Sequence, residues 1–121
     1  MPVDIISGLP DRVVGIVAKG TVDSDDYTSV IEPAVDDVLA EHDKIRLLYV
    51  LGPDFTGCTI GGAWEDGKLG MGHLTRWEMI AMVTDHEWIR HTVQLLGHLL
   101  PGKVKVFSAD QMDDARAWVA S

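Results

Sequence analysis

The residues best suited to nucleophilic or phosphate chemistry lie near the middle of the chain. Cys58 is the single cysteine, and Thr56 and Thr59 flank it at the predicted start of a helix. A helix N-terminus favours the nucleophilic thiolate and offers free backbone amides to a phosphate. Hydroxyl residues there also cap helices by default, and no basic partner for Cys58 is assured. We therefore expect a structural thiol, with Thr56, Cys58 and Thr59 as candidates for interaction at a helix N-terminus.

A second candidate, residues 62–69, nearly matches the phosphate-binding pattern G-x-x-x-x-G-K-[ST]. Leu69 replaces the hydroxyl residue that would bind magnesium, and Glu65 and Asp66 would repel phosphate groups. No predicted strand leads directly into the first glycine, so the structural context of such a loop is missing as well. We expect no nucleotide binding or phosphotransfer that depends on Lys68.

The histidines suggest only a weak metal site. The best ligand spacing is that of Glu87 and His91, one helical turn apart, with His98 at longer reach. No further carboxylate or cysteine completes the set, so solvated residues on a helix face explain these groups. The sequence also lacks a G-x-S-x-G motif, paired carboxylates on an apolar wall and a basic cluster. We expect no catalytic residues, no metal, no cofactor and no enzymatic activity.

Strands and helices must alternate to position these residues. Strands are predicted where apolar residues are β-branched or run continuously, at residues 5–9, 13–18, 45–51, 77–83 and 104–107. Helices are predicted where apolar residues recur at helical spacing, from residue 24 to the charged residues 41–43, over 85–100 and around 115–119. A further helix is predicted within residues 55–73, because a crossover must join the strands that end near Leu51 and begin near Trp77. The order β-β-α-β-α-β-α-β-α predicts an α/β fold with a mainly parallel five-stranded sheet and an antiparallel edge strand.

Local signals add detail to the predicted helices. Asp23 or Ser24 is placed to cap the first helix, and Pro33 should kink that helix or split it into two pieces. Thr84 and Glu87 match a capping box at the start of the third helix. The apolar stripe of the third helix is expected in the core and consists of Trp88, Ile89, Val93, Leu96 and Leu100.

Composition restricts the partners and the compartment. The 121 residues fit one domain, residues 1–121, and 10 basic against 19 acidic residues leave a net charge of −9. This charge argues against nucleic acid and anionic membranes as partners, because both require a basic surface. The single cysteine, the lack of a signal peptide and the lack of a transmembrane segment predict a cytoplasmic protein in a reducing environment.

The predicted second helix has an unusual composition. Six of the chain's 12 glycines fall within residues 55–73, and each costs a helix about 0.5–1 kcal/mol relative to alanine. The same segment carries large apolar side chains, namely Phe55, Ile60, Trp64, Leu69 and Met71. Two interpretations are open: a loose crossover whose apolar side chains pack on the sheet, or a mobile lid over an apolar pocket.

The order and spacing of short motifs resemble the SpoIIAA-like family over nearly the whole chain. These motifs are Asp26-Tyr27, Pro33, residues 46–48, residues 61–66 (GGAWED), residues 81–85 with Trp88, residues 101–107 and residues 114–119. The resemblance implies a fold like the STAS domains of anti-sigma-factor antagonists and sulfate transporters, with relatives among lipid-binding CRAL-TRIO-like folds. The antagonists carry a phosphorylatable serine at the start of the second helix, where this sequence has Thr56-Gly57-Cys58-Thr59. The resemblance therefore does not extend to a phosphorylation switch.

Two functions are consistent with these patterns. The first is a non-catalytic binding module that holds a small apolar or lipid-like ligand beneath the glycine-rich segment, with walls from Phe55, Trp64, Leu69 and Met71. The second is a STAS-type regulatory module that binds a protein partner through its acidic surface and the start of the second helix. A hydrolase or redox enzyme using Cys58 ranks third. The sequence does not determine the oligomeric state, and it is compatible with a homodimer.

Overall fold

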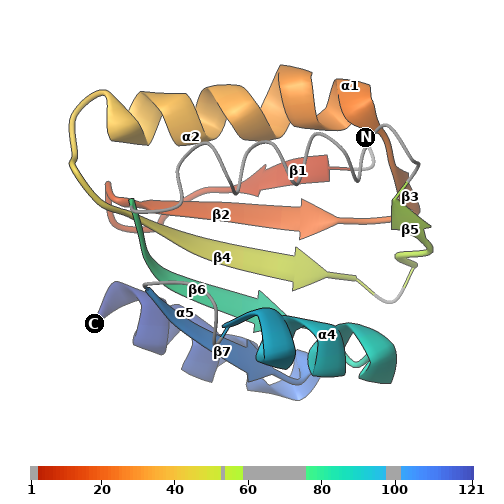
Figure 1. Ribbon diagram of the computed structural model, residues 1–121. Coiled ribbons are helices and arrows are strands. Elements are labelled where there is room, and N and C mark those ends of the chain that lie inside the picture. Colours follow the sequence, from red (N-terminus) through yellow and green to blue (C-terminus); the bar gives the residue numbers. More distant parts are fainter. Residues whose placement is uncertain (1–2, 53, 59–75, 98–101) are drawn as a thin grey trace.

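A five-stranded sheet is the centre of the molecule (Figure 1). The computed structural model describes residues 3–52, 54–58, 76–97 and 102–121. The strands lie in the order β1 (Val3–Ile6), β2 (Val13–Ala18), β4 (Ile45–Leu51), β6 (Trp77–Val83) and β7 (Lys103–Phe107). β1 pairs with β2 in the antiparallel direction, and all other neighbours are parallel. The predicted fold class is confirmed, including the antiparallel edge strand.

A second, two-stranded sheet was not predicted. β3 (Thr21–Val22) pairs in parallel with β5 (Gly57–Cys58), and the Thr21 and Thr56 hydroxyl oxygens lie 2.7 Å apart beside this pair. Gly57 has a φ of +135°, which an L side chain rarely adopts. The second helix therefore does not begin at residue 55 as predicted, because residues 57 and 58 are extended and paired. Residues 59–73 of that prediction lie outside the described part of the chain.

The first helical region runs from Ser24 to Leu39 in three segments: α1 (Ser24–Asp26), the π-helical turn η1 (Tyr27–Ile31) and α2 (Glu32–Leu39). Asp23 caps it, since the Asp26 amide donates to the Asp23 carboxylate and the Asp23 amide donates to the Asp26 carboxylate. Pro33 has no amide for an α-helical bond to the carbonyl four residues back. The π turn lies immediately before this position, with the Glu32 amide donating to the Tyr27 carbonyl. The helix type therefore changes just before Pro33, but the backbone stays helical from Ser24 to Leu39, so the predicted split into two pieces is not found.

The start of α4 (Glu87–Gly97) differs from the predicted capping box. The His86 amide donates to the Thr84 hydroxyl as expected, at 3.1 Å. The Thr84 amide, however, donates to the carbonyl of Phe107 at the end of β7, and the Glu87 carboxylate lies 3.8 Å from His91. The prediction of a capping box is therefore wrong, because the Thr84 amide that Glu87 was expected to bind donates to β7 instead.

The apolar stripe of α4 is also only partly core. Ile89 is buried and Val93 is half-buried against the sheet. Trp88, by contrast, is 66% exposed, so its predicted place in the core is wrong. Leu100 lies outside the described residues. α4 lies over β7 at the edge of the sheet, and a helix there buries one narrow side and leaves the other to solvent.

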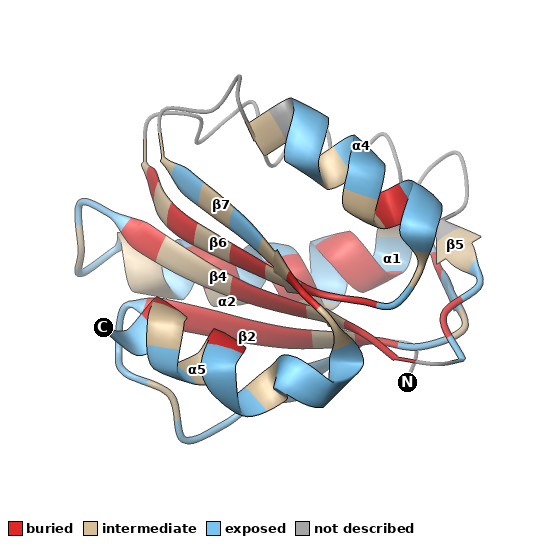
Figure 2. Cartoon of the chain, turned by 90° about the horizontal axis from the view of Figure 1, so that it is seen from below, coloured by how far each residue is buried: buried red, intermediate tan, exposed pale blue. Residues whose placement is uncertain are grey.

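Helices cover both faces of the sheet. Figure 2 shows α4 on one side of β6 and β7 and α5 (Met112–Ala120) on the other, preceded by the short turn η2 (Ala109–Gln111). The α5 side has its own core, with Leu48, Ala81 and Val119 fully buried. Arg46 in β4 ties this helix down, since its guanidinium donates to the carbonyls of Val119 and Ser121 and to the carboxylate of Glu78.

Candidate ligand-binding site

On the face of the sheet that α2 and α4 cover, three apolar side chains of β4 and β6 are only partly buried. Leu47 of β4 stands opposite Ile80 of β6, and Met82 follows two residues later on the same face. All three are half-buried, although they lie in the middle of the sheet. Val104 and Val106 of β7 pair with Ile80 and Met82 and are half-buried too. We call Leu47, Ile80 and Met82 the apolar floor.

The opposite face of β6 is covered more fully. Along β6, Met79, Ala81 and Val83 point toward α5 and are all buried. Alternate residues of one strand therefore have different environments on the two faces. Because interior strands of a parallel sheet are normally buried on both faces, the partial exposure of Ile80 and Met82 marks a place where packing is incomplete.

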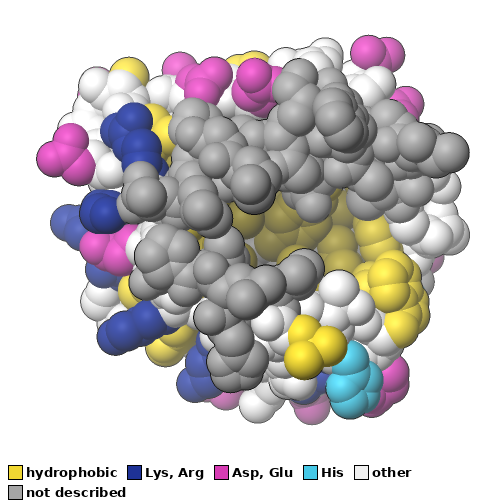
Figure 3. All heavy atoms as spheres, viewed as in Figure 1, with side chains coloured by type: hydrophobic (Ala, Val, Ile, Leu, Met, Phe, Trp, Pro, Cys, Tyr) yellow, Lys and Arg dark blue, Asp and Glu magenta, His cyan; other side chains and the backbone are white. Residues whose placement is uncertain are grey.

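The walls beside the apolar floor are hydrophobic as well. Val30 of η1, Ala34 and Val38 of α2, and Val93 of α4 are half-buried and pack against the core on this face. Figure 3 shows the surface hollowed between the α1 and α2 side and α4, with hydrophobic side chains at the bottom of the hollow. The hollow suits the hydrocarbon part of a ligand, because apolar surface there is still open to solvent.

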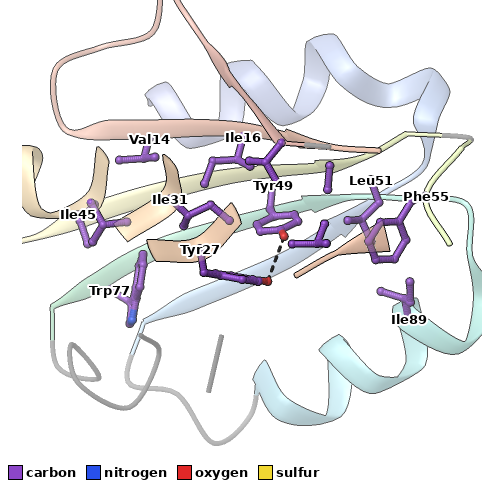
Figure 4. Close-up of a cluster of buried hydrophobic side chains, with 14 residues drawn as sticks. Val14, Ile16, Tyr27, Ile31, Ile45, Tyr49, Leu51, Phe55, Trp77 and Ile89 are labelled. Atoms are coloured by element: carbon purple, nitrogen blue, oxygen red, sulfur yellow. Dashed lines mark hydrogen bonds between the residues drawn. The ribbon is translucent and has the colours of Figure 1, made fainter. Parts of the chain in front are cut away.

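A pair of buried tyrosines lies on the same face. Tyr27 of η1 and Tyr49 of β4 point toward one another, and their hydroxyl oxygens are 3.2 Å apart (Figure 4). Both rings are buried, and Tyr49 stands opposite Met82 of the apolar floor. The hydroxyl contact joins η1 to the sheet, so the tyrosines support one edge of the hollow.

The four predicted ligand-binding residues have different outcomes. Phe55 is buried in the core of this face, and its ring meets the His86 ring edge-on with centroids 6.0 Å apart. It is therefore a packing residue at the carboxyl end of the sheet. Trp64, Leu69 and Met71 lie outside the described residues, and so does Lys68 of the near-match to a phosphate loop.

The predicted helix N-terminus candidates are only partly placed. Thr56 is exposed, its amide donates to the Gly20 carbonyl, and its hydroxyl contacts that of Thr21. Cys58 follows in β5, while Thr59 lies outside the described residues. The backbone of Cys58 thus belongs to the small second sheet, and Thr56 immediately precedes it.

Two small cavities lie at opposite ends of the sheet. One, of about 360 Å³, is at the carboxyl end and is lined by Leu51, Gly52, Asp85, His86 and Ala109. The other, of about 230 Å³, lies at the amino end and is lined by Pro10, Arg12, Val13, Arg46, Ala120 and Ser121. Asp85 in the first cavity accepts from the Ala109 amide, and Arg12 and Arg46 in the second both lie against the Glu78 carboxylate, so these charged groups already have structural partners.

The described residues contain no group of three or more His, Cys, Asp or Glu side chains that could hold a metal ion. Glu87 and His91 form an exposed pair across one helical turn, and His98 lies outside the described residues. Over the ranges that the structure covers, no helix has the length and apolarity needed to cross a membrane.

Sequence reasoning missed the apolar floor and the tyrosine pair. Leu47, Ile80 and Met82 stand in continuous apolar runs, which indicate strands buried on both faces. No local signal separates a side chain that is fully covered from one that is covered halfway, because coverage depends on helices distant in the sequence. Tyr27 and Tyr49 are 22 residues apart in the chain, and only the packing of η1 on β4 brings them together.

Comparison with known proteins agrees with this architecture. The family model described as SpoIIAA-like matches residues 13–120. A crystal structure of an uncharacterized protein with a SpoIIAA-like fold from Shewanella loihica PV-4 superimposes with a TM-score of 0.78 at 24% sequence identity, covering 97% of this chain and 91% of that one. No curated protein matches the chain.

Proposed function

We propose that this chain, which belongs to the SpoIIAA-like family, is a non-catalytic binding module for a small, largely apolar ligand. The ligand rests on the apolar floor, between α2 and α4. The observation that carries the proposal is the contrast between the two faces of β6, where Ile80 and Met82 are half-buried while Ala81 and Val83 are fully buried. A ligand on this face would complete the packing that the described residues leave open.

The apolar side chains of the floor favour a hydrocarbon ligand. Leu47, Ile80 and Met82 carry no charge and no hydrogen-bonding group beyond the weakly accepting thioether sulfur. Each methylene group that a ligand buries there contributes about 0.8 kcal/mol, so a long alkyl chain gains more than a short one. Met82 adds adaptability, because its unbranched thioether fills irregular gaps. A long-chain fatty acid is therefore a suitable probe.

The sequence-based lid hypothesis extends this proposal. It holds that Trp64, Leu69 and Met71 close the site from above, and these residues lie outside the described part of the chain. If it is right, amide hydrogen exchange is fast from about residue 57 to residue 72 in the free protein and slows there when fatty acid is added. Fast exchange that fatty acid leaves unchanged would separate ligand binding from lid closure.

The direct test combines native mass spectrometry with titration of a fatty acid. Protein freshly purified from its host, before delipidation, should carry a copurifying apolar molecule. After delipidation, palmitate should bind saturably and raise the free energy of unfolding, because a ligand that binds only the folded state stabilises it, by about 2.7 kcal/mol at a free concentration 100 times Kd. Absence of both copurification and saturable binding would refute the proposal.

A matched pair of substitutions locates the binding site. Ile80→Thr removes apolar contact from the floor and should weaken palmitate binding about tenfold, or about 1.4 kcal/mol. Val50→Thr makes a similar change at a half-buried position of β4 on the α5 side and should leave affinity unchanged. Equal effects of the two variants would mean that any binding occurs elsewhere or reflects general destabilisation.

A protein-interaction role is the second candidate, and one observation favours it. The exposed Thr56, the edge of the small second sheet and the 360 Å³ cavity beside His86 lie together at the carboxyl end. Such a surface suits a loop of a partner protein. Thr56→Arg would block it without disturbing the apolar floor, so loss of a partner from a host pull-down in this variant alone, with palmitate binding intact, would favour this second role.

A further inference from the structure

The outward side of α4 carries apolar residues in a regular pattern. Trp88 is 66% and Leu95 72% exposed, and they lie seven residues apart on the same side of the helix. His91 and Thr92 stand between them and are exposed as well. Figure 2 shows α4 coloured mostly as exposed. We call Trp88, His91, Thr92 and Leu95 the outer stripe of α4.

The two polar residues of the outer stripe differ in their contacts within the helix. The Thr92 hydroxyl donates to the Trp88 carbonyl at 2.8 Å, which leaves its methyl group facing outward. The His91 imidazole lies 3.8 Å from the Glu87 carboxylate. Covering the stripe would therefore bury apolar surface without leaving the Thr92 hydroxyl unpaired, whereas burial of the His91 imidazole at its centre carries a polar cost.

The pattern of the outer stripe is complementary to itself. In an antiparallel pair of α4 helices, Trp88 of one copy faces Leu95 of the other at both ends, and His91 and Thr92 face one another at the centre. A twofold axis needs one surface that fits its own rotated copy, and twofold dimers are the commonest soluble oligomers. The spacing of three, four and seven residues is also that of a helix-to-helix seam.

The distribution of charge favours the same occupant. Eight of the chain's 19 acidic residues fall between Thr21 and Asp43, a range without lysine or arginine, so two copies that met through α1 and α2 would repel each other. α4 carries one acidic and one basic residue, Glu87 and Arg90, which cancel. It is therefore a helix through which two chains of net charge −9 can approach with little repulsion.

We infer that the outer stripe of α4 is the docking surface for a second copy of this chain, in an antiparallel twofold arrangement. This inference is independent of the proposed ligand site, because the stripe faces away from the apolar floor. A single helix of 11 residues buries less than the roughly 1,200–2,000 Å² of a standard stable interface, so the dimer dissociates on dilution. Dimerisation covers Trp88 only when the protein is concentrated.

Sedimentation velocity of the full chain tests this inference over a concentration range from about 10 to about 500 µM. The wild-type protein should shift from monomer to dimer across this range. Trp88→Glu and Leu95→Lys should each raise the dissociation constant at least about tenfold, since each places a charge against an apolar side chain. Both positions are exposed, so both variants should remain folded by circular dichroism.

Mixing the two variants tests the orientation. In an antiparallel pair, Glu at position 88 of one chain meets Lys at position 95 of the other, while the second contact remains the native Trp88 against Leu95. An equimolar mixture should therefore form heterodimers that neither variant forms alone. Ile5→Lys is the control, because Ile5 is also an exposed apolar residue but lies on β1, and this variant should dimerise like the wild type.

Three results would overturn the inference. A wild-type protein that stays monomeric at every concentration would mean that the stripe faces another kind of partner. A dimer that survives both single substitutions would place the interface elsewhere. A mixture that stays monomeric although the wild type dimerises would exclude the antiparallel arrangement.

Discussion

Trp77 and Trp88 are the same residue type in opposite environments. Trp77 begins β6 and stands opposite Ile45 of β4. It is 5% exposed and lies in the core on the face that α2 and α4 cover. Trp88 lies in the first turn of α4 and is 66% exposed. The difference comes from the direction of each side chain, since α4 turns Ile89 and Val93 toward the sheet and Trp88 away from it.

The two tryptophans should therefore contribute very differently to stability. Trp77→Ala should lower the free energy of unfolding by about 3–5 kcal/mol, the usual cost of truncating a buried aromatic side chain. Trp88→Ala should lower it by less than about 1 kcal/mol, because an exposed side chain loses little packing. Urea unfolding at a concentration where the chain is monomeric measures both, and equal losses would contradict the assigned environments.

At the scale of elements, β6 and β7 approach each other closely where β7 begins. A Cβ atom at Gly102 would overlap the Trp77 carbonyl oxygen and lie 3.0 Å from that of Glu78. Both obstacles are backbone atoms of an interior strand, which cannot move aside without disturbing the pairing with β4. Glycine at this position is therefore a requirement of the sheet and not only a way to end the preceding segment.

Gly102→Ala should destabilise the protein by about 1–3 kcal/mol, the usual cost of forcing an extra methyl group into packed structure. Gly52→Ala is the comparison, since a Cβ atom there would meet the Ala18 carbonyl oxygen at an ordinary 3.5 Å, and we expect a change of less than about 0.5 kcal/mol. Thermal unfolding of both variants distinguishes them. A tolerated Gly102→Ala would show that β7 can shift along β6.

For the whole molecule, the uneven charge has an energetic consequence. Asp25, Glu32, Asp37, Glu41 and Asp43 are exposed along the first helical region and the turn after it, without a lysine or arginine among them until Lys44. Like charges at this spacing repel one another in the folded state more than in an extended chain. The fold therefore tolerates a local electrostatic cost, which keeps two copies apart on this side.

Added salt should consequently stabilise the protein. Raising NaCl from about 20 to about 300 mM shortens the distance over which charges interact, so the urea midpoint should rise. Asp37→Lys should add about 0.5 kcal/mol and weaken the salt dependence, whereas Asp54→Lys, with the same change in net charge but outside the helix, should do less. Equal gains would mean that net charge matters more than the cluster, and a falling midpoint would refute the repulsion.

The order of the five strands of the main sheet and the class of fold were predictable from the sequence. Strand β2 carries a largely β-branched apolar run, β4 and β6 carry apolar runs with one charged residue each, and Asp23 and Pro33 act through backbone chemistry that is local. Local rules hold because caps, turns and strand propensity depend on residues within a few positions. The parallel sheet then follows from the alternation of strands with helices.

Which apolar side chains are covered depends on the tertiary structure. Trp88 and Ile89 are neighbours in one apolar stripe, yet one faces solvent and the other the core. In the sequence, Leu47, Ile80 and Met82 look like ordinary core residues. The paired residues of β3 and β5 are 36 positions apart in the chain. Burial and pairing of this kind depend on elements distant in the sequence, so the candidate ligand site and the outer stripe of α4 emerge only when those elements pack together.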